Sequence, residues 1–140
     1  MNLPAKLRNL LSALAGLVAG AFLNGGIIQL SHWVIPPPPG ADLTTEAGLK
    51  SAMHLMGPEH FLMPFLAHAL GTLAGAMLAA RLSNALRPAM SIGFLFFLAG
   101  AYMVWILPSP IWFSIADLSL AYLPMAWLGF KTGRKSLSGS

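Results

Sequence analysis

The stretch FLMPFLAHALGTLAGAMLAA, residues 61–80, decides the fold, because its twenty residues include no Asp, Glu, Lys or Arg. A transmembrane α-helix needs about 20 consecutive, predominantly apolar residues to cross the hydrocarbon core of a bilayer. The only strongly polar side chains inside the run are those of His68 and Thr72. The segment therefore predicts a membrane-spanning helix that carries a titratable side chain.

The composition of the whole chain agrees with this prediction. Of 140 residues, 56% are hydrophobic and only 9% are charged, whereas about 25% of residues are charged in an average soluble domain. So few charges cannot cover the surface of a water-soluble domain of this size. The absence of cysteine excludes disulfide bonds, thiolate metal sites and cysteine nucleophiles.

We expect a single domain, residues 1–140, with an all-α fold: a bundle of four transmembrane helices and a short external amphipathic helix. The expected helices cover residues 10–35, 59–81, 88–107 and 110–130. An external loop is expected at 36–58 and a cytoplasmic tail at 131–140. The last two helices should form a tight hairpin, because only Pro108-Ser109-Pro110 separates their apolar runs. A signal peptide cleaved near residue 21 is the alternative for the first run, but its apolar part continues about 14 residues further.

The basic residues predict the orientation of the spans. One side of the membrane would hold only Lys50, and the other side would hold seven residues: Lys6, Arg8, Arg81, Arg87, Lys131, Arg134 and Lys135. Cytoplasmic loops carry an excess of Lys and Arg. Both termini are therefore expected in the cytoplasm. The basic pI then reflects membrane orientation, and nucleic-acid binding is not expected.

The external loop has its own pattern. Pro36 to Pro39 form a stiff polyproline stretch. Thr44 or Thr45 followed by Glu46 is typical of a helix start. After this start, one face at helical spacing carries the apolar side chains of Leu49, Ala52, Met53 and Met56. These features predict a short helix that lies on the outer membrane surface.

Small residues recur at four-residue spacing in the first two spans. Ser12, Gly16, Gly20 and Asn24 follow one another in the first span, and Ala67, Gly71, Gly75 and Ala79 in the second. Small side chains let membrane helices approach closely. The two stripes are expected to face each other or the bundle interior. A homo-oligomer or a membrane partner bound through Gly16, Gly20, Gly71 and Gly75 is a further possibility.

Polar side chains within the spans are the candidate site. An ionised carboxylate at Asp117 would cost about 2.5–3.5 kcal/mol in the bilayer unless it faced a partner or a wet cavity. His68 is on the same helix face as Gly71 and Gly75. Counted from the outer ends of their helices, His68 and Asn24 are both roughly 15 Å deep, and Tyr102 and Gln29 are shallower. We expect these five residues, one or two from each helix, to cluster in the outer half of the membrane.

Three functions remain open for such a cluster. The first is a site for a small solute or a lipid-like ligand, either a binding site alone or part of a transport path, that opens to the outer side. The second is a non-catalytic structural or accessory subunit of a larger membrane complex, in which the polar groups only satisfy each other. A membrane enzyme is the third and least expected. No catalytic residue is assigned, because no activated serine accompanies His68 and Asp117.

Neither a cofactor nor a metal ion is expected. A bis-histidine haem needs two histidines at matching depth on different helices, and the other histidines of the chain all fall near the surface. The outer-face residues Asp42, Glu59, His32, His54 and His60 match no standard metal-binding spacing.

Three stretches taken together resemble a family of small four-helix bacterial membrane proteins of unknown function. They are Pro36 to Asp42 (PPPPGAD), Ala67 to Thr72 (AHALGT), and Pro108 to Phe113 (PSPIWF) followed by Asp117. The resemblance runs from about Gln29 to Gly129. It implies a four-helix fold in the bacterial inner membrane and draws attention to His68 and Asp117, but it implies no activity. The family often has an acidic residue at the position of Gln29, and this departure weakens any role that needs a charged pair near the first helix.

Overall fold

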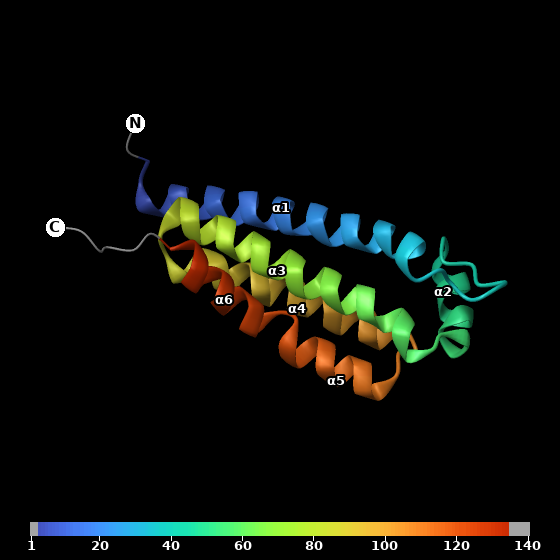
Figure 1. Ribbon diagram of the computed structural model, residues 1–140. Helices are drawn as coiled ribbons and strands as arrows, with labels where there is room; N and C mark the ends of the chain where they lie inside the picture. Colours follow the sequence, from blue (N-terminus) through green and yellow to red (C-terminus); the bar gives the residue numbers. More distant parts are fainter. Residues whose placement is uncertain (1–2, 135–140) are drawn as a thin grey trace.

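The computed structural model describes residues 3–134, which form α-helices and short 3-10 helices with no β-strand among them. Four segments are long and apolar enough to span a membrane: Ala5–Val34, Pro58–Ser83, Leu86–Ile106 and Ile111–Gly133. The prediction of an all-α bundle of four membrane-spanning segments is thereby confirmed. In Figure 1 the start of α1 and the end of α6 lie at one end of the bundle, and α2 lies at the other end.

Helices α1 (Ala5–Val34) and α3 (Leu62–Ser83) form the most extensive helix pair, and glycine makes their close approach possible. A Cβ atom on Gly71 would come 2.8 Å from the carbonyl oxygen of Gly20, and one on Gly75 would come 2.5 Å from that of Gly16. The two small-residue stripes thus face each other, as the sequence predicts. All four glycines are buried within one chain, so they do not present a surface to a second copy or to a membrane partner.

The half of the bundle that contains the start of α1 and the end of α6 is packed mainly from small side chains of three helices: α3, α4 (Leu86–Ile106) and α6 (Leu123–Gly133). Its fully buried members are Ala76, Ala79, Ala80, Ala89, Ile92 and Ala126. Glycines on α6 lie directly against the backbone of α3, because a Cβ atom on Gly129 would come 2.6 Å from the carbonyl oxygen of Leu73. Close backbone contact of this kind substitutes for the hydrophobic drive that membrane helices lack.

The fourth span is not one continuous helix over residues 110–130, and this corrects the prediction. It consists of α5 (Ile111–Leu120) and α6, with Ala121 and Tyr122 between them in a turn. Pro124 explains the interruption: it has no N–H to donate to the carbonyl of Leu120, and its ring would clash with that carbonyl in a regular helix. Figure 1 shows α5 diverging from the axis of α6 at this turn.

The helix ends also differ from the expected positions. α1 begins at Ala5, directly after Pro4, so Lys6 and Arg8 belong to the helix instead of preceding it. The second span opens with a 3-10 turn, η2 (Pro58–Phe61), before α3 starts at Leu62. α6 continues to Gly133, so the expected tail at 131–140 is helical in its first part. Residues 135–140 of that tail lie outside the described part of the chain.

The segment between α1 and α3 contains α2 (Glu46–Ala52) followed by the 3-10 turn η1 (Met53–Leu55). Thr45 is the N-cap, and its hydroxyl accepts a hydrogen bond of 3.0 Å from the backbone N–H of Gly48. Asp42 accepts hydrogen bonds from the backbone N–H and the hydroxyl of Thr44, at 2.9 and 2.6 Å, and from the hydroxyl of Thr45. These bonds to the ionised form hold the pKa of the exposed Asp42 carboxyl below its usual value of 3.8.

Candidate functional site: a buried His-Asp-Tyr cluster

The carboxylate of Asp117 is the centre of the candidate site. α5 directs it into the bundle, where the residue is only 2% exposed. Its Oδ1 atom lies 2.8 Å from Nδ1 of His68, which α3 contributes, and its Oδ2 lies 3.0 Å from the same nitrogen. An unpaired carboxylate in a bilayer is costly. The contact explains how Asp117 is accommodated, and it confirms that these two residues meet.

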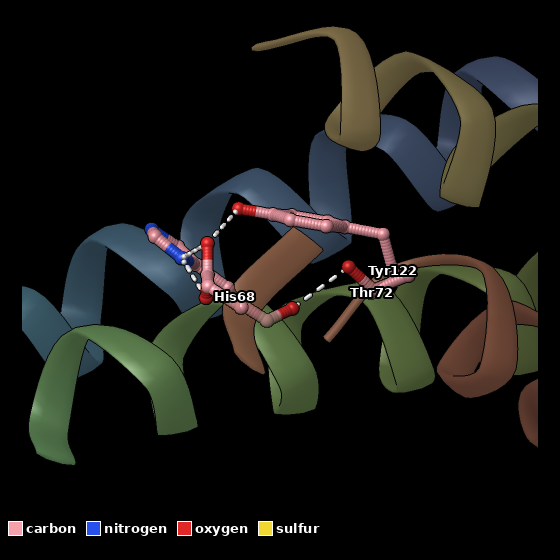
Figure 2. Close-up of polar contacts among 4 residues, drawn as sticks. His68, Thr72 and Tyr122 are labelled. Carbon is pink, nitrogen blue, oxygen red and sulfur yellow. Dashed lines mark hydrogen bonds and ion pairs between the residues drawn. The ribbon is translucent and has the colours of Figure 1, made fainter. Parts of the chain in front are cut away.

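Tyr122 completes the cluster from the turn between α5 and α6. Its hydroxyl donates a hydrogen bond of 2.8 Å to Oδ2 of Asp117. Its ring stacks on the imidazole of His68, with 5.6 Å between centroids and 28° between planes (Figure 2). The hydroxyl also fits over Gly100 of α4, where a Cβ atom would collide with it. Asp117 therefore has hydrogen-bond donors on both carboxylate oxygens.

Thr72 supports His68 from the next turn of α3. Its hydroxyl donates a hydrogen bond of 2.7 Å to the carbonyl oxygen of His68, one helical turn away (Figure 2). This back-bond satisfies a fully buried hydroxyl within its own helix. The hydroxyl proton of Thr72 is therefore used within α3 and is not available as a donor to the site.

The contact with Asp117 bears on the tautomer of His68. An ionised carboxylate only accepts, so opposite an ionised Asp117 the facing nitrogen, Nδ1, would carry the proton. In the neutral ring, Nε2 is then an unprotonated acceptor. Among residues 3–134, Nε2 has no hydrogen-bond partner, and the His68 side chain is 26% exposed. Asp117 thus orients the ring and leaves its second nitrogen open.

Asn24 lies at the same level of the bundle. In the antiparallel pairing of α1 with α3, Gly16 meets Gly75 and Gly20 meets Gly71. Continuing this register by one turn places Asn24 opposite Ala67, the residue before His68. The Cβ of Asn24 packs against Gly71, and its Oδ1 is buried without a hydrogen-bond partner. The predicted neighbourhood of Asn24 and His68 therefore exists, although no direct hydrogen bond joins them.

The remaining two predicted residues are not part of the cluster. Tyr102 is 56% exposed and contacts the ring edge of Trp105. It follows the buried Gly100 by two positions, which is about 200° around a helix, so it faces away from the bundle. Gln29 is exposed on α1. The expectation of one polar side chain from each helix is therefore not met. α4 contributes no polar side chain, and its Gly100 only leaves room for the hydroxyl of Tyr122.

Tyr122 is the residue that the sequence reasoning missed. In an uninterrupted helix, a residue five positions after Asp117 would point about 140° away from it. The turn at Ala121 and Tyr122 removes this separation and returns the phenol to the carboxylate. Pro124 was the available signal, because a proline inside an apolar span predicts an interruption just before it.

A groove of about 950 Å³ lies between α4 and α5, near the connection that joins them. Ser114 and Leu118 of α5 and Phe97 of α4 are among its lining residues, but Asp117 and His68 are not. Across residues 3–134, no group of three or more His, Asp or Glu side chains has the geometry to hold a metal ion.

Comparison of the chain with protein-family models, with curated proteins and with solved structures finds no match. The chemistry of the cluster is therefore the basis on which a function can be argued.

Proposed function

We propose that this protein binds, and as an extension transports, a small solute or lipid-like ligand in the outer half of a bacterial inner membrane. His68 is the residue that contacts the ligand, and the ligand donates a hydrogen bond to Nε2. The chain orientation in this proposal has both termini in the cytoplasm. The seven-to-one distribution of basic residues supports this orientation.

One observation carries the proposal: Asp117 fixes the His68 ring, while Nε2 has no hydrogen-bond partner in the described chain and the side chain remains partly exposed. A purely structural pair would satisfy both ring nitrogens, because an unpaired polar atom in hydrocarbon is unfavourable. A carboxylate that accepts from one nitrogen of a neutral imidazole makes the other nitrogen a stronger hydrogen-bond acceptor. This arrangement suits the recognition of a hydrogen-bond donor.

The role of an accessory subunit has lost its main support. That alternative relied on the small-residue stripes as a docking surface, and the stripes are buried between α1 and α3. The exposed side chains of α1 include the large apolar ones of Leu14, Val18 and Phe22. Such a surface is typical of contact with lipid.

The test is native mass spectrometry of the protein in nanodiscs prepared directly from membranes. The wild-type chain should retain a small molecule that the His68→Leu/Asp117→Leu variant lacks. The double change avoids an unpaired Asp117 and keeps the site apolar, so the variant should fold. Tyr102→Phe is the control and should retain the same molecule. A wild-type chain without any bound molecule, or a double variant that keeps it, would refute the proposal.

A further inference from the structure

The end of the bundle at which α1 begins and α6 ends has charged side chains of one sign only among residues 3–134. We call this surface the basic end, and it comprises Lys6, Arg8, Arg81, Arg87, Lys131 and Arg134. All six residues are exposed. Three of the four acidic side chains lie between α1 and α3, at the end where Figure 1 shows α2, and the fourth is Asp117 in α5.

In the described chain, no carboxylate neutralises these six cations. The only Lys or Arg of residues 3–134 that has an ion pair is Lys50, which contacts Glu46 at 2.8 Å. Lysine and arginine side chains are charged at neutral pH, so the basic end is positive whatever the protonation state of His68 and Asp117. A surface of one charge sign attracts a partner of the opposite sign. The partner that complements this surface is therefore anionic.

Three arginines of the basic end lie near one level, on three adjacent helices. They are Arg81 of α3, Arg87 of α4 and Arg134, which directly follows α6. Gly133, the last residue of α6, lies against the backbone of Met77, one turn before Arg81. Gly93 of α4 lies against Ala126 of α6, and since these helices run in opposite directions, the first turn of α4 is level with the last turn of α6. Guanidinium groups gathered in this way suit a phosphate, whose oxygens accept paired hydrogen bonds from arginine.

Aromatic rings of α6 indicate that the basic end lies at the depth of lipid headgroups. The ammonium of Lys131 lies 4.4 Å from the centroid of the Trp127 ring, and the guanidinium carbon of Arg134 lies 5.6 Å from that of Phe130. Tryptophan is enriched where membrane spans reach the headgroup region, and the Trp127 side chain is half-exposed. A cation that lies over such a ring is positioned to contact a headgroup.

We infer that the basic end binds the headgroup of an anionic phospholipid, whose phosphate forms ion pairs with Arg81, Arg87 and Arg134. A zwitterionic headgroup such as phosphatidylcholine has no net charge and should be bound more weakly. This surface is separate from the proposed ligand site, because Arg81 follows His68 by 13 positions of the same helix, which is about 20 Å.

The experiment measures tryptophan fluorescence in vesicles that mix phosphatidylcholine with phosphatidylglycerol, one of which carries bromine on its acyl chains. Bromine quenches a neighbouring tryptophan, so the two brominated mixtures report the lipid composition around that residue. One variant keeps only Trp127 and another keeps only Trp105, at the opposite end of α4, with phenylalanine at the other tryptophan positions. Phosphatidylglycerol should be enriched about fivefold or more around Trp127, the factor that one basic residue near a membrane surface contributes. It should not be enriched around Trp105.

Two further changes test the cause of the enrichment. Arg81→Gln/Arg87→Gln in the Trp127-only protein should remove most of it, and because both residues are exposed and neither has an ion pair in the described chain, the variant should fold. Lys50→Gln is the matched control and should change nothing. Sodium chloride at about 1 M should also lower the enrichment, because it shortens the Debye length to about 3 Å.

Equal enrichment around the two tryptophans, or full enrichment in Arg81→Gln/Arg87→Gln, would overturn the inference. Inorganic phosphate should displace no more phosphatidylglycerol than sodium chloride does at the same ionic strength. If phosphate displaces more, the surface binds free phosphate and the lipid assignment is wrong. These measurements include no change at His68, so they succeed or fail independently of the proposed ligand site.

Discussion

The carboxylate of Asp117 lies 2.8 Å from Nδ1 of His68, although 49 positions separate the two residues along the chain. The contact joins α3 to α5, two helices that otherwise touch little. It supplies the partner that a membrane-embedded carboxylate requires, and it orients the imidazole whose other nitrogen we assign to ligand binding.

The contributions of His68 and Asp117 to the free energy of unfolding should not be additive. His68→Leu leaves a buried carboxylate with one donor, and we expect it to lower the free energy of unfolding by about 3–5 kcal/mol. The double variant His68→Leu/Asp117→Leu should be much less destabilised, because no unpaired charge remains. Equilibrium unfolding in mixed micelles measures both. Additive effects of the two single changes would contradict a direct interaction.

Tyr122→Phe should destabilise the protein by about 1.5–3 kcal/mol, because it removes a hydrogen bond to an ionised group. The matched control is Tyr102→Phe, which alters an exposed phenol outside the cluster. The same unfolding measurement compares them. Equal effects of the two changes would place Tyr122 outside the cluster.

The close contact between α1 and α3 predicts that two Gly→Ala changes will affect the stability of the protein differently. Gly75→Ala would bring a Cβ atom 2.5 Å from the carbonyl of Gly16 and should cost about 1–3 kcal/mol of stability. Gly26→Ala meets nothing within 4 Å, so it should be neutral or slightly stabilising, since alanine favours the helix. Thermal unfolding of the two variants checks the prediction, and a stabilising Gly75→Ala would exclude the close helix contact.

Asp42 should titrate below its usual pKa of 3.8, because the folded protein stabilises its ionised form through Thr44 and Thr45. A depressed folded-state pKa contributes stability above the unfolded pKa, and this contribution is lost as the pH falls through the folded value. Carbon NMR of the Asp42 carboxyl against pH measures the shift. Thr44→Val should move the pKa back toward 3.8, whereas an unchanged value would rule out the side-chain bond as a cause.

The orientation is testable by labelling because the chain contains no cysteine. Ser51 is exposed in α2 and Thr132 is exposed near the end of α6. A membrane-impermeant maleimide added to intact cells whose outer membrane has been permeabilised should label Ser51→Cys and spare Thr132→Cys. Disruption of the inner membrane should expose both. Labelling of Thr132→Cys alone in intact cells would reverse the proposed topology.

The spans, the inward-facing glycine stripes and a helix start at Thr44 or Thr45 were all predictable, because each depends on local sequence or on simple helical periodicity. The pairing of His68 with Asp117 was partly predictable, since each side chain needs a polar neighbour in a bilayer. The presence of Tyr122 in the cluster and the absence of Tyr102 from it were not predicted. Their positions depend on the helix break before Pro124 and on the rotation of α4, which tertiary packing determines.

The central claim is that Nε2 of His68 is an open acceptor, and nitrogen NMR of the protein with ¹⁵N-labelled histidine in lipid bilayers tests it directly. With the His68 signals assigned through the His68→Gln variant, the account predicts a protonated Nδ1 and an unprotonated Nε2. A proton bound to Nε2 would contradict the assignment, because that nitrogen would then be a donor and could not accept a hydrogen bond from a ligand.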